Sequence, residues 1–126
     1  MREGAVEANR DDDHEFADLL HSLGLQRNVA KVITYLAVAG ESTSREIERK
    51  TGLRQPEISI AMRRLHHQNW IREWDVKNTE GKGRPSKVYA LSTPIDEIIG
   101  FIEEERRKES AEAMENIQKL RDLVSN

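Results

Sequence analysis

Apolar residues in the first forty positions recur with the period of an α-helix. One set stands at i, i+3, i+4 and i+7 before Gly24, and consists of Phe16, Leu19, Leu20 and Leu23. A second set lies before Gly40, and consists of Val29, Val32, Ile33 and Leu36. Such spacing places each set on one helical face, and glycine commonly ends a helix. This part of the chain therefore predicts two amphipathic helices.

Two shorter helices are predicted between Thr43 and about residue 68. Thr43 and Glu46 have the spacing of a capping box, in which the hydroxyl accepts from the Glu46 amide while the carboxylate reaches back. Gly52 suits the left-handed end of this helix. The next helix has Pro56 in its first turn, and Asn69 can provide a left-handed exit. Its apolar stripe consists of Ile58, Ala61, Met62 and Leu65. Two short helices around a tight glycine-containing turn make a helix-turn-helix.

The period of the pattern changes after residue 69. Segments 70–77 and 86–91 are rich in aromatic and branched residues and partly alternate, which is typical of strands. The polar segment 78–85 between them contains two glycines and a proline. The sequence therefore predicts a β-hairpin with a basic tip directly after the helix-turn-helix, which is the order of a winged helix-turn-helix. We expect a mainly α protein with one small β-hairpin.

A long helix is predicted from residue 93 to the end of the chain. Thr93 and Pro94 have the form of an N-cap and first helical residue. Without a strong breaker up to Val124, this helix would span about 45 Å. Its last part has the 4, 3, 4 apolar spacing of a coiled coil. Because a lone helix would leave that stripe in water, we expect a second copy to cover it. The expected contacts are Ile99, Ile102, Ala113, Ile117, Leu120 and Val124.

These elements predict three parts along the chain. Residues 1–13 read as a disordered acidic tail, because they offer little to bury. Residues 14–92 form the winged helix-turn-helix domain, and residues 93–126 the C-terminal dimerisation helix. A chain of 126 residues has room for one such domain with an appended helix.

Composition excludes several kinds of site. Without cysteine there is no disulfide, catalytic thiol or cysteine-ligated metal. No apolar run approaches the roughly 18 residues of a membrane span, and the N-terminus lacks an apolar signal core, so we expect a cytoplasmic protein. There is no P-loop or HExxH motif, and the adjacent His66 and His67 would point about 100° apart on a helix. We therefore expect no catalysis, no metal and no cofactor.

The net charge of −3 conceals a basic central segment. From Thr43 to Leu91 there are eleven Lys and Arg residues against six Asp and Glu, a local charge of +5, which leaves −8 for the rest. A basic segment between acidic flanks is typical of a protein that binds a polyanion on one face.

The helix at about 55–68 is the expected recognition helix. In helix-turn-helix docking its N-terminal turns enter the major groove of double-stranded DNA. The face opposite its apolar stripe and the adjacent flanks carry the expected base-reading residues Gln55, Ser59, Ile60 and Arg63. Glutamine and arginine contact adenine and guanine in bidentate fashion, and isoleucine can contact the thymine methyl group.

Phosphate contacts are expected beside these base-reading residues. Arg54 and Arg64 suit the phosphate backbone. In the wing at 78–85, Arg84 can enter a narrow minor groove, with Lys82 and Lys87 on flanking phosphates. Glu57 has two possible roles, either favouring the positive end of its helix or accepting a hydrogen bond from cytosine.

Residues 23–91 resemble the winged helices of MarR-type and TrmB-like transcription regulators. The resemblance rests on the wing's Gly-Arg-Pro and on these short motifs: Leu23-Gly24-Leu25, Thr43 to Ile47, Thr51-Gly52-Leu53, Ile58-Ser59 and Leu65. Several archaeal regulators are similar in pairing one such domain with a C-terminal dimerising helix. The resemblance implies a homodimer on a near-palindromic operator, with its recognition helices in successive major grooves.

The sequence departs from this family pattern at several points. Arg54 stands where a Ser, Asp or Thr N-cap is usual, and Asn69 replaces a glycine. The sugar-binding domain of full TrmB proteins is missing, and no polar constellation predicts a phenolic ligand of the MarR kind. Any small-molecule effector is therefore left unidentified.

An alternative function fits the same fold, because winged helices also serve as protein–protein interaction modules without DNA. In such a module the exposed face of the second helix should be neutral or acidic and the wing short. The basic residues at 63, 64, 82 and 84 favour DNA.

Overall fold

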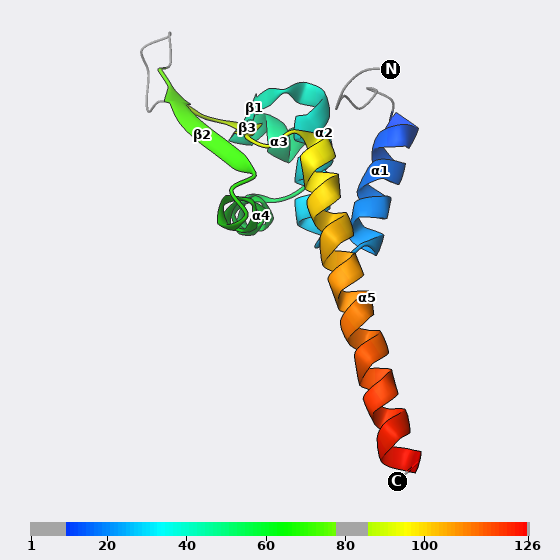
Figure 1. Ribbon diagram of the computed structural model, residues 1–126. Coiled ribbons are helices and arrows are strands. Elements are labelled where there is room, and N and C mark those ends of the chain that lie inside the picture. Colours follow the sequence, from blue (N-terminus) through cyan, green and yellow to red (C-terminus); the bar gives the residue numbers. More distant parts are fainter. Residues whose placement is uncertain (1–9, 78–85, 126) are drawn as a thin grey trace. The chain divides into compact units, whose positions relative to one another are not determined.

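The computed structural model describes residues 10–77 and 86–125; residues 1–9, 78–85 and 126 lie outside the description. Its elements follow one another along the chain as shown in Figure 1: α1 (Arg10–Ser22), α2 (Arg27–Ala39), β1 (Glu41–Thr43), α3 (Ser44–Thr51), α4 (Gln55–His67), β2 (Ile71–Val76), β3 (Ser86–Leu91) and α5 (Ile95–Ser125). The fold is a winged helix-turn-helix followed by a long C-terminal helix, which confirms the predicted fold class.

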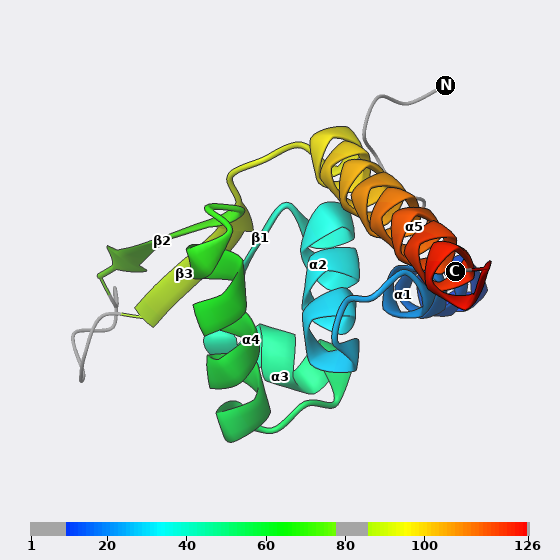
Figure 2. The same ribbon diagram turned by 60° about the horizontal axis from the view of Figure 1, so that its bottom comes forward.

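The chain forms two compact units that divide between Ile95 and Asp96. Within the first unit, α2, α3 and α4 pack against one another, and Figure 2 shows α3 between the other two helices. The core is built from branched apolar side chains that are almost fully buried: Val32, Ile33, Leu36, Ile47, Ile58 and Leu65. Ile47 is the only apolar residue of α3, so one side chain anchors the first helix of the motif in the core.

The first helix begins earlier than the sequence predicted. α1 starts at Arg10, inside the segment 1–13 that was expected to be a disordered tail. Three consecutive aspartates, Asp11 to Asp13, stand in its first turn. Negative charge is favourable at a helix N-terminus, because it faces the positive end of the helix dipole. The acidic run that suggested a tail therefore suits a helix start.

A third strand joins the predicted hairpin. The sheet has the antiparallel order β1-β3-β2, in which Thr43 faces Val88 and Trp74 faces Val88 from the other side. β1 has only three residues, Glu-Ser-Thr, and they show no strand pattern. Its pairing with β3, more than forty residues away, makes it a strand. The sequence analysis did not predict it.

The two ends of α3 follow the predicted local chemistry. The Glu46 amide donates to the Thr43 hydroxyl at 3.2 Å, which is the first half of the capping box. The Glu46 carboxylate instead accepts from the Ser42 hydroxyl at 3.4 Å. Gly52 ends the helix with φ 77° and ψ 4°, in the left-handed region. The turn between α3 and α4 therefore depends on a conformation that glycine adopts without strain.

Replacing Gly52 with alanine is expected to lower the free energy of unfolding by about 1 kcal/mol or somewhat more. A Cβ atom there would meet no atom within 4 Å, so the cost is backbone strain alone. Chemical denaturation monitored by circular dichroism measures it. Gly100→Ala, inside α5 and equally without a neighbour, is the matched control and should cause no loss. A Gly52→Ala protein as stable as the wild type would contradict this account of the turn.

Asn69 provides the exit from α4, as predicted. It has φ 63° and is the only non-glycine residue with positive φ in the described part of the chain. Asparagine tolerates this region better than most residues. The Asn69 carbonyl oxygen accepts hydrogen bonds from the hydroxyls of Ser92 at 3.0 Å and Thr93 at 3.3 Å. These bonds tie the end of the helix-turn-helix to the segment that follows the hairpin.

Candidate nucleic-acid interface

Helix α4 separates a buried face from an exposed one. Ile58, Ala61, Met62 and Leu65 are buried, as the apolar stripe predicted. The four expected base-reading side chains, Gln55, Ser59, Ile60 and Arg63, are all exposed. Gln55, Ser59 and Arg63 follow one another at i, i+4 and i+8, which places them along one line of the helix. Ile60 lies beside this line with 42% of its surface exposed.

The side chain of Gln55 accepts a hydrogen bond from Ser44, the first residue of α3. The Ser44 hydroxyl donates to Gln55 Oε1 at 3.2 Å. An amide oxygen has two lone pairs, so Oε1 can accept this bond and still accept a second one. The sequence analysis missed Ser44, because the two residues are eleven positions apart and meet only when the helix-turn-helix has formed.

The start of α4 shows the first of the two roles expected for Glu57, and the contact with cytosine stays a prediction. Its Oε1 atom accepts from the Arg54 backbone N–H at 2.8 Å, so Glu57 caps the helix. The Arg54 guanidinium has no acceptor atom, so only this half of a capping box can form. Arg54 nevertheless occupies the N-cap position, and its side chain is exposed at the entry to the helix. Glu57 thereby supplies the side-chain hydrogen bond that Arg54, at the N-cap, cannot provide.

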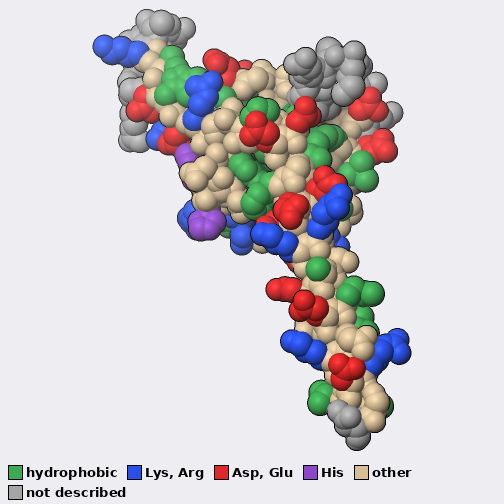
Figure 3. Space-filling view, in the orientation of Figure 1, with side chains coloured by type: hydrophobic (Ala, Val, Ile, Leu, Met, Phe, Trp, Pro, Cys, Tyr) green, Lys and Arg blue, Asp and Glu red, His purple; other side chains and the backbone are tan. Residues whose placement is uncertain are grey.

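Positive charge gathers over the exposed side of α4. In Figure 3 blue Lys and Arg side chains and purple His side chains lie together over this helix. The helix contributes exposed Arg63, Arg64, His66 and His67. With Arg54 at its start, α4 carries a basic surface next to its candidate base-reading line.

Part of the predicted wing contact lies outside the described residues, namely Lys82 and Arg84 in segment 78–85. Lys87, at the start of β3, is described. Its ammonium group pairs with Glu73 Oε2 at 2.9 Å, and His66 Nε2 donates to Glu73 Oε1 at 2.6 Å. The hydrogen bond from Lys87, and next that from His66, lower the pKa of Glu73 below its ordinary value. Sequence analysis did not single out Glu73.

The opposite face of the hairpin carries an aromatic contact. The Arg72 guanidinium lies over the Trp74 ring, 4.7 Å from its centroid. An arginine on an indole face gains a cation–π interaction. Arg72 is therefore stacked on the hairpin itself, and strand alternation directs it away from the face that carries Glu73.

The apolar residues of α5 divide into a buried and an exposed group. Ile95, Ile98 and Ile102 recur at i, i+3 and i+7 and are at most 5% exposed. Ile102, which was predicted to contact a second copy, is 4% exposed in the single chain, and its part in a dimer interface stays a prediction. Ile99 lies off this face and is 43% exposed.

The C-terminal half of α5 is solvent-exposed in the single chain. Ile117, Leu120 and Val124 are 44%, 62% and 86% exposed, and Ala113 is exposed as well. Met114 and Leu123 flank them with 63% and 74% exposure. The sequence analysis did not include these two residues, although both neighbour a predicted contact. We call these six exposed residues the α5 stripe: Ala113, Met114, Ile117, Leu120, Leu123 and Val124.

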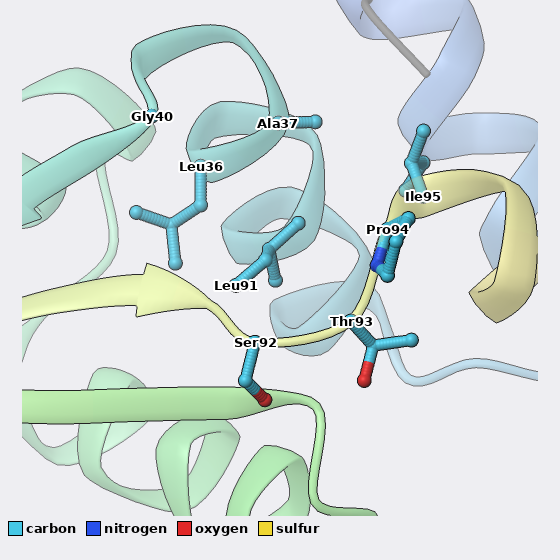
Figure 4. Close-up of a pocket in the computed structure, with 8 residues that line it drawn as sticks. All are labelled: Leu36, Ala37, Gly40, Leu91, Ser92, Thr93, Pro94 and Ile95. Carbon is cyan, nitrogen blue, oxygen red and sulfur yellow. The ribbon is translucent and has the colours of Figure 1, made fainter. Parts of the chain in front are cut away.

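A shallow hollow of about 320 Å³ lies beside the end of β3. Figure 4 shows its lining, which includes Leu36 and Leu91. Its two side-chain hydroxyls, on Ser92 and Thr93, already donate to the Asn69 carbonyl oxygen. The lining therefore offers mainly apolar contact and does not identify an effector.

Within the described ranges no group of three or more His, Asp or Glu residues is arranged to hold a metal ion. Among the same residues, no helix is both long enough and apolar enough to cross a membrane.

Comparisons with known proteins show similarity to solved structures. No protein-family model matches the chain, and no curated protein does. A solved structure described as a PadR-like transcription factor from Bacteroides fragilis is similar over 86% of this chain and 99% of its own, with 18% sequence identity and a TM-score of 0.47. The expected resemblance to MarR-type and TrmB-like regulators stays a prediction.

Proposed function

We propose that this protein is a sequence-specific regulator of transcription that binds double-stranded DNA as a homodimer. In this proposal α4 lies in the major groove, and the wing at 78–85 lies on the minor groove. The observation that carries the proposal is the exposed line of Gln55, Ser59 and Arg63 on α4, with Ile60 beside it. These side chains can read base edges by hydrogen bonds and by contact with a methyl group.

The electrostatics of α4 support the same role. Arg54 and Arg64 flank the base-reading line, and both are exposed. Phosphate contacts from such residues orient a recognition helix without reading sequence. The acidic excess of the whole chain lies outside the segment that carries α4 and the hairpin. The overall charge of −3 is therefore compatible with a basic DNA-binding face.

The α5 stripe supports a homodimer. It exposes several large apolar side chains, recurring at coiled-coil spacing, in a chain that is otherwise rich in charge. The same stripe on a second copy offers a surface of matching length and apolar character. A two-fold dimer would present its α4 helices to half-sites one helical turn apart, about 34 Å or 10 base pairs. A near-palindromic operator follows from that symmetry.

Binding to DNA is tested most directly by a salt series. Fluorescence anisotropy with a labelled random-sequence duplex should give a plot of log K against log salt with a slope steeper than about −4, because each phosphate contact contributes about −0.9. Affinity would then fall roughly 15-fold for each doubling of salt.

The alternative, an interaction module that does not touch DNA, makes the opposite prediction. Absence of measurable affinity for duplex DNA at low salt would contradict the proposed function and favour the module.

A further inference from the structure

Glu73 joins α4 to the two hairpin strands through a histidine and a lysine. His66 belongs to the last turn of α4, Glu73 to β2 and Lys87 to β3. One carboxylate oxygen accepts from His66 at 2.6 Å and the other from Lys87 at 2.9 Å. Both oxygens of Glu73 are thus engaged by side chains from neighbouring elements.

All three side chains lie at the surface. The exposed fractions are 43% for His66, 30% for Glu73 and 46% for Lys87. Ion pairs with this degree of exposure contribute little to stability, typically about 0–1 kcal/mol, because water solvates both partners. Fold stability alone therefore gives a weak reason for this arrangement.

The same two side chains, His66 and Lys87, border the face that is proposed to meet DNA. His66 follows Arg63 by three residues on α4, and Lys87 stands at the base of the wing. A phosphate oxygen binds an ammonium or imidazolium N–H with the same charge-assisted geometry as a carboxylate oxygen. Glu73 therefore occupies the donors that a backbone phosphate would use.

We propose that Glu73 is an internal competitor of the DNA backbone: it holds Lys87 and His66 in the free protein, and a phosphate must displace it to bind them. This inference rests on the proposed function. Its consequence is that Glu73 limits the phosphate contribution to affinity. Because that contribution is independent of sequence, Glu73 restrains binding to random DNA in particular.

The first test compares the wild type with Glu73→Gln on a random-sequence duplex over a salt series. The variant should bind about 5- to 10-fold more tightly at low salt, and its slope should be steeper by about 0.9 for each subunit on the duplex, the value for one added phosphate contact. Glu48→Gln, an exposed carboxylate on α3, is the control that removes the same charge. It should change affinity by less than about twofold. If Glu73→Gln and Glu48→Gln gained the same affinity, the change in net charge alone would explain the gain, and the proposal would be overturned.

The second test is a double-mutant cycle with Lys87→Gln. In the wild type, Lys87→Gln should weaken DNA binding by at most about twofold, because the ammonium group is already held. In the Glu73→Gln background the same change should cost about 5- to 10-fold, because the freed ammonium group now binds phosphate. Equal losses in the two backgrounds would overturn the proposal, and so would weaker DNA binding by Glu73→Gln with an unchanged melting curve.

Different results would contradict the proposed DNA binding and the competitor role of Glu73. If neither the wild type nor Glu73→Gln binds DNA at low salt, the proposed function fails and the competitor role fails with it. If the wild type binds with a steep salt slope and Glu73→Gln does not differ from it, the competitor role alone is wrong.

Discussion

Replacing Leu120 with glutamate is expected to convert the protein to a monomer and to lower its affinity for a duplex with two half-sites by about 100-fold or more. Leu120 lies at the centre of the α5 stripe and is 62% exposed in the single chain. In a two-fold dimer both copies would bring the new carboxylate into an apolar interface, where an unpaired charge is costly. Each monomer would then bind one half-site on its own, and the gain in affinity that comes from joining two DNA-binding domains would be lost.

Light scattering gives the oligomeric state, and anisotropy with one- and two-site duplexes gives the loss of affinity. Lys119→Glu is the matched control, because it introduces the same residue one position earlier, about 100° around the helix. This control should remain a dimer. A dimeric Leu120→Glu protein would place the interface elsewhere, whereas a monomer that binds the two-site duplex as tightly as the wild type would contradict the two-fold arrangement.

Replacing Arg63 with alanine is expected to abolish discrimination at one base pair of each half-site, a loss of about 10- to 100-fold per half-site. Arg63 is exposed on the line of α4 that begins at Gln55, within reach of base edges if α4 docks by its exposed face. A bidentate arginine–guanine contact is the commonest specific contact of this kind. Removing the guanidinium takes away both donors at once.

Arg64→Ala is the matched control on the adjacent residue. As a phosphate contact, Arg64 should contribute equally on all sequences, so its loss should lower the salt slope by about 0.9 for each subunit and leave base preference intact. Selection of bound duplexes from a random pool, for the wild type and both variants, measures base preference directly. Similar, sequence-blind losses in Arg63→Ala and Arg64→Ala would refute this division of roles.

Features that depend on a few neighbouring residues were predictable from the sequence. The Thr43 cap, the left-handed Gly52 and the Asn69 exit each arise from backbone chemistry within one or two turns. Periodicity likewise predicted both strands of the hairpin and the buried face of α4. The start of α1 was missed, because an acidic run is typical both of a tail and of a helix N-terminus.

Features that depend on which distant elements meet were decided by the tertiary structure. β1 is a strand because β3 lies next to it, and Ser44 holds Gln55 because the turn brings α3 to α4.

The winged helix-turn-helix and the exposed line of Gln55, Ser59 and Arg63 on α4 were thus determined by the sequence itself, through local backbone preferences and the spacing of apolar residues. The bridge from His66 through Glu73 to Lys87 was decided only by the tertiary structure. The spacing of residues along the chain does not predict such a contact, because the contact forms only when the helix and strands that carry the residues pack together. The physical reason is that side-chain ion pairs reach only a few ångströms, whereas these three residues are separated by 7 and 14 positions in the chain.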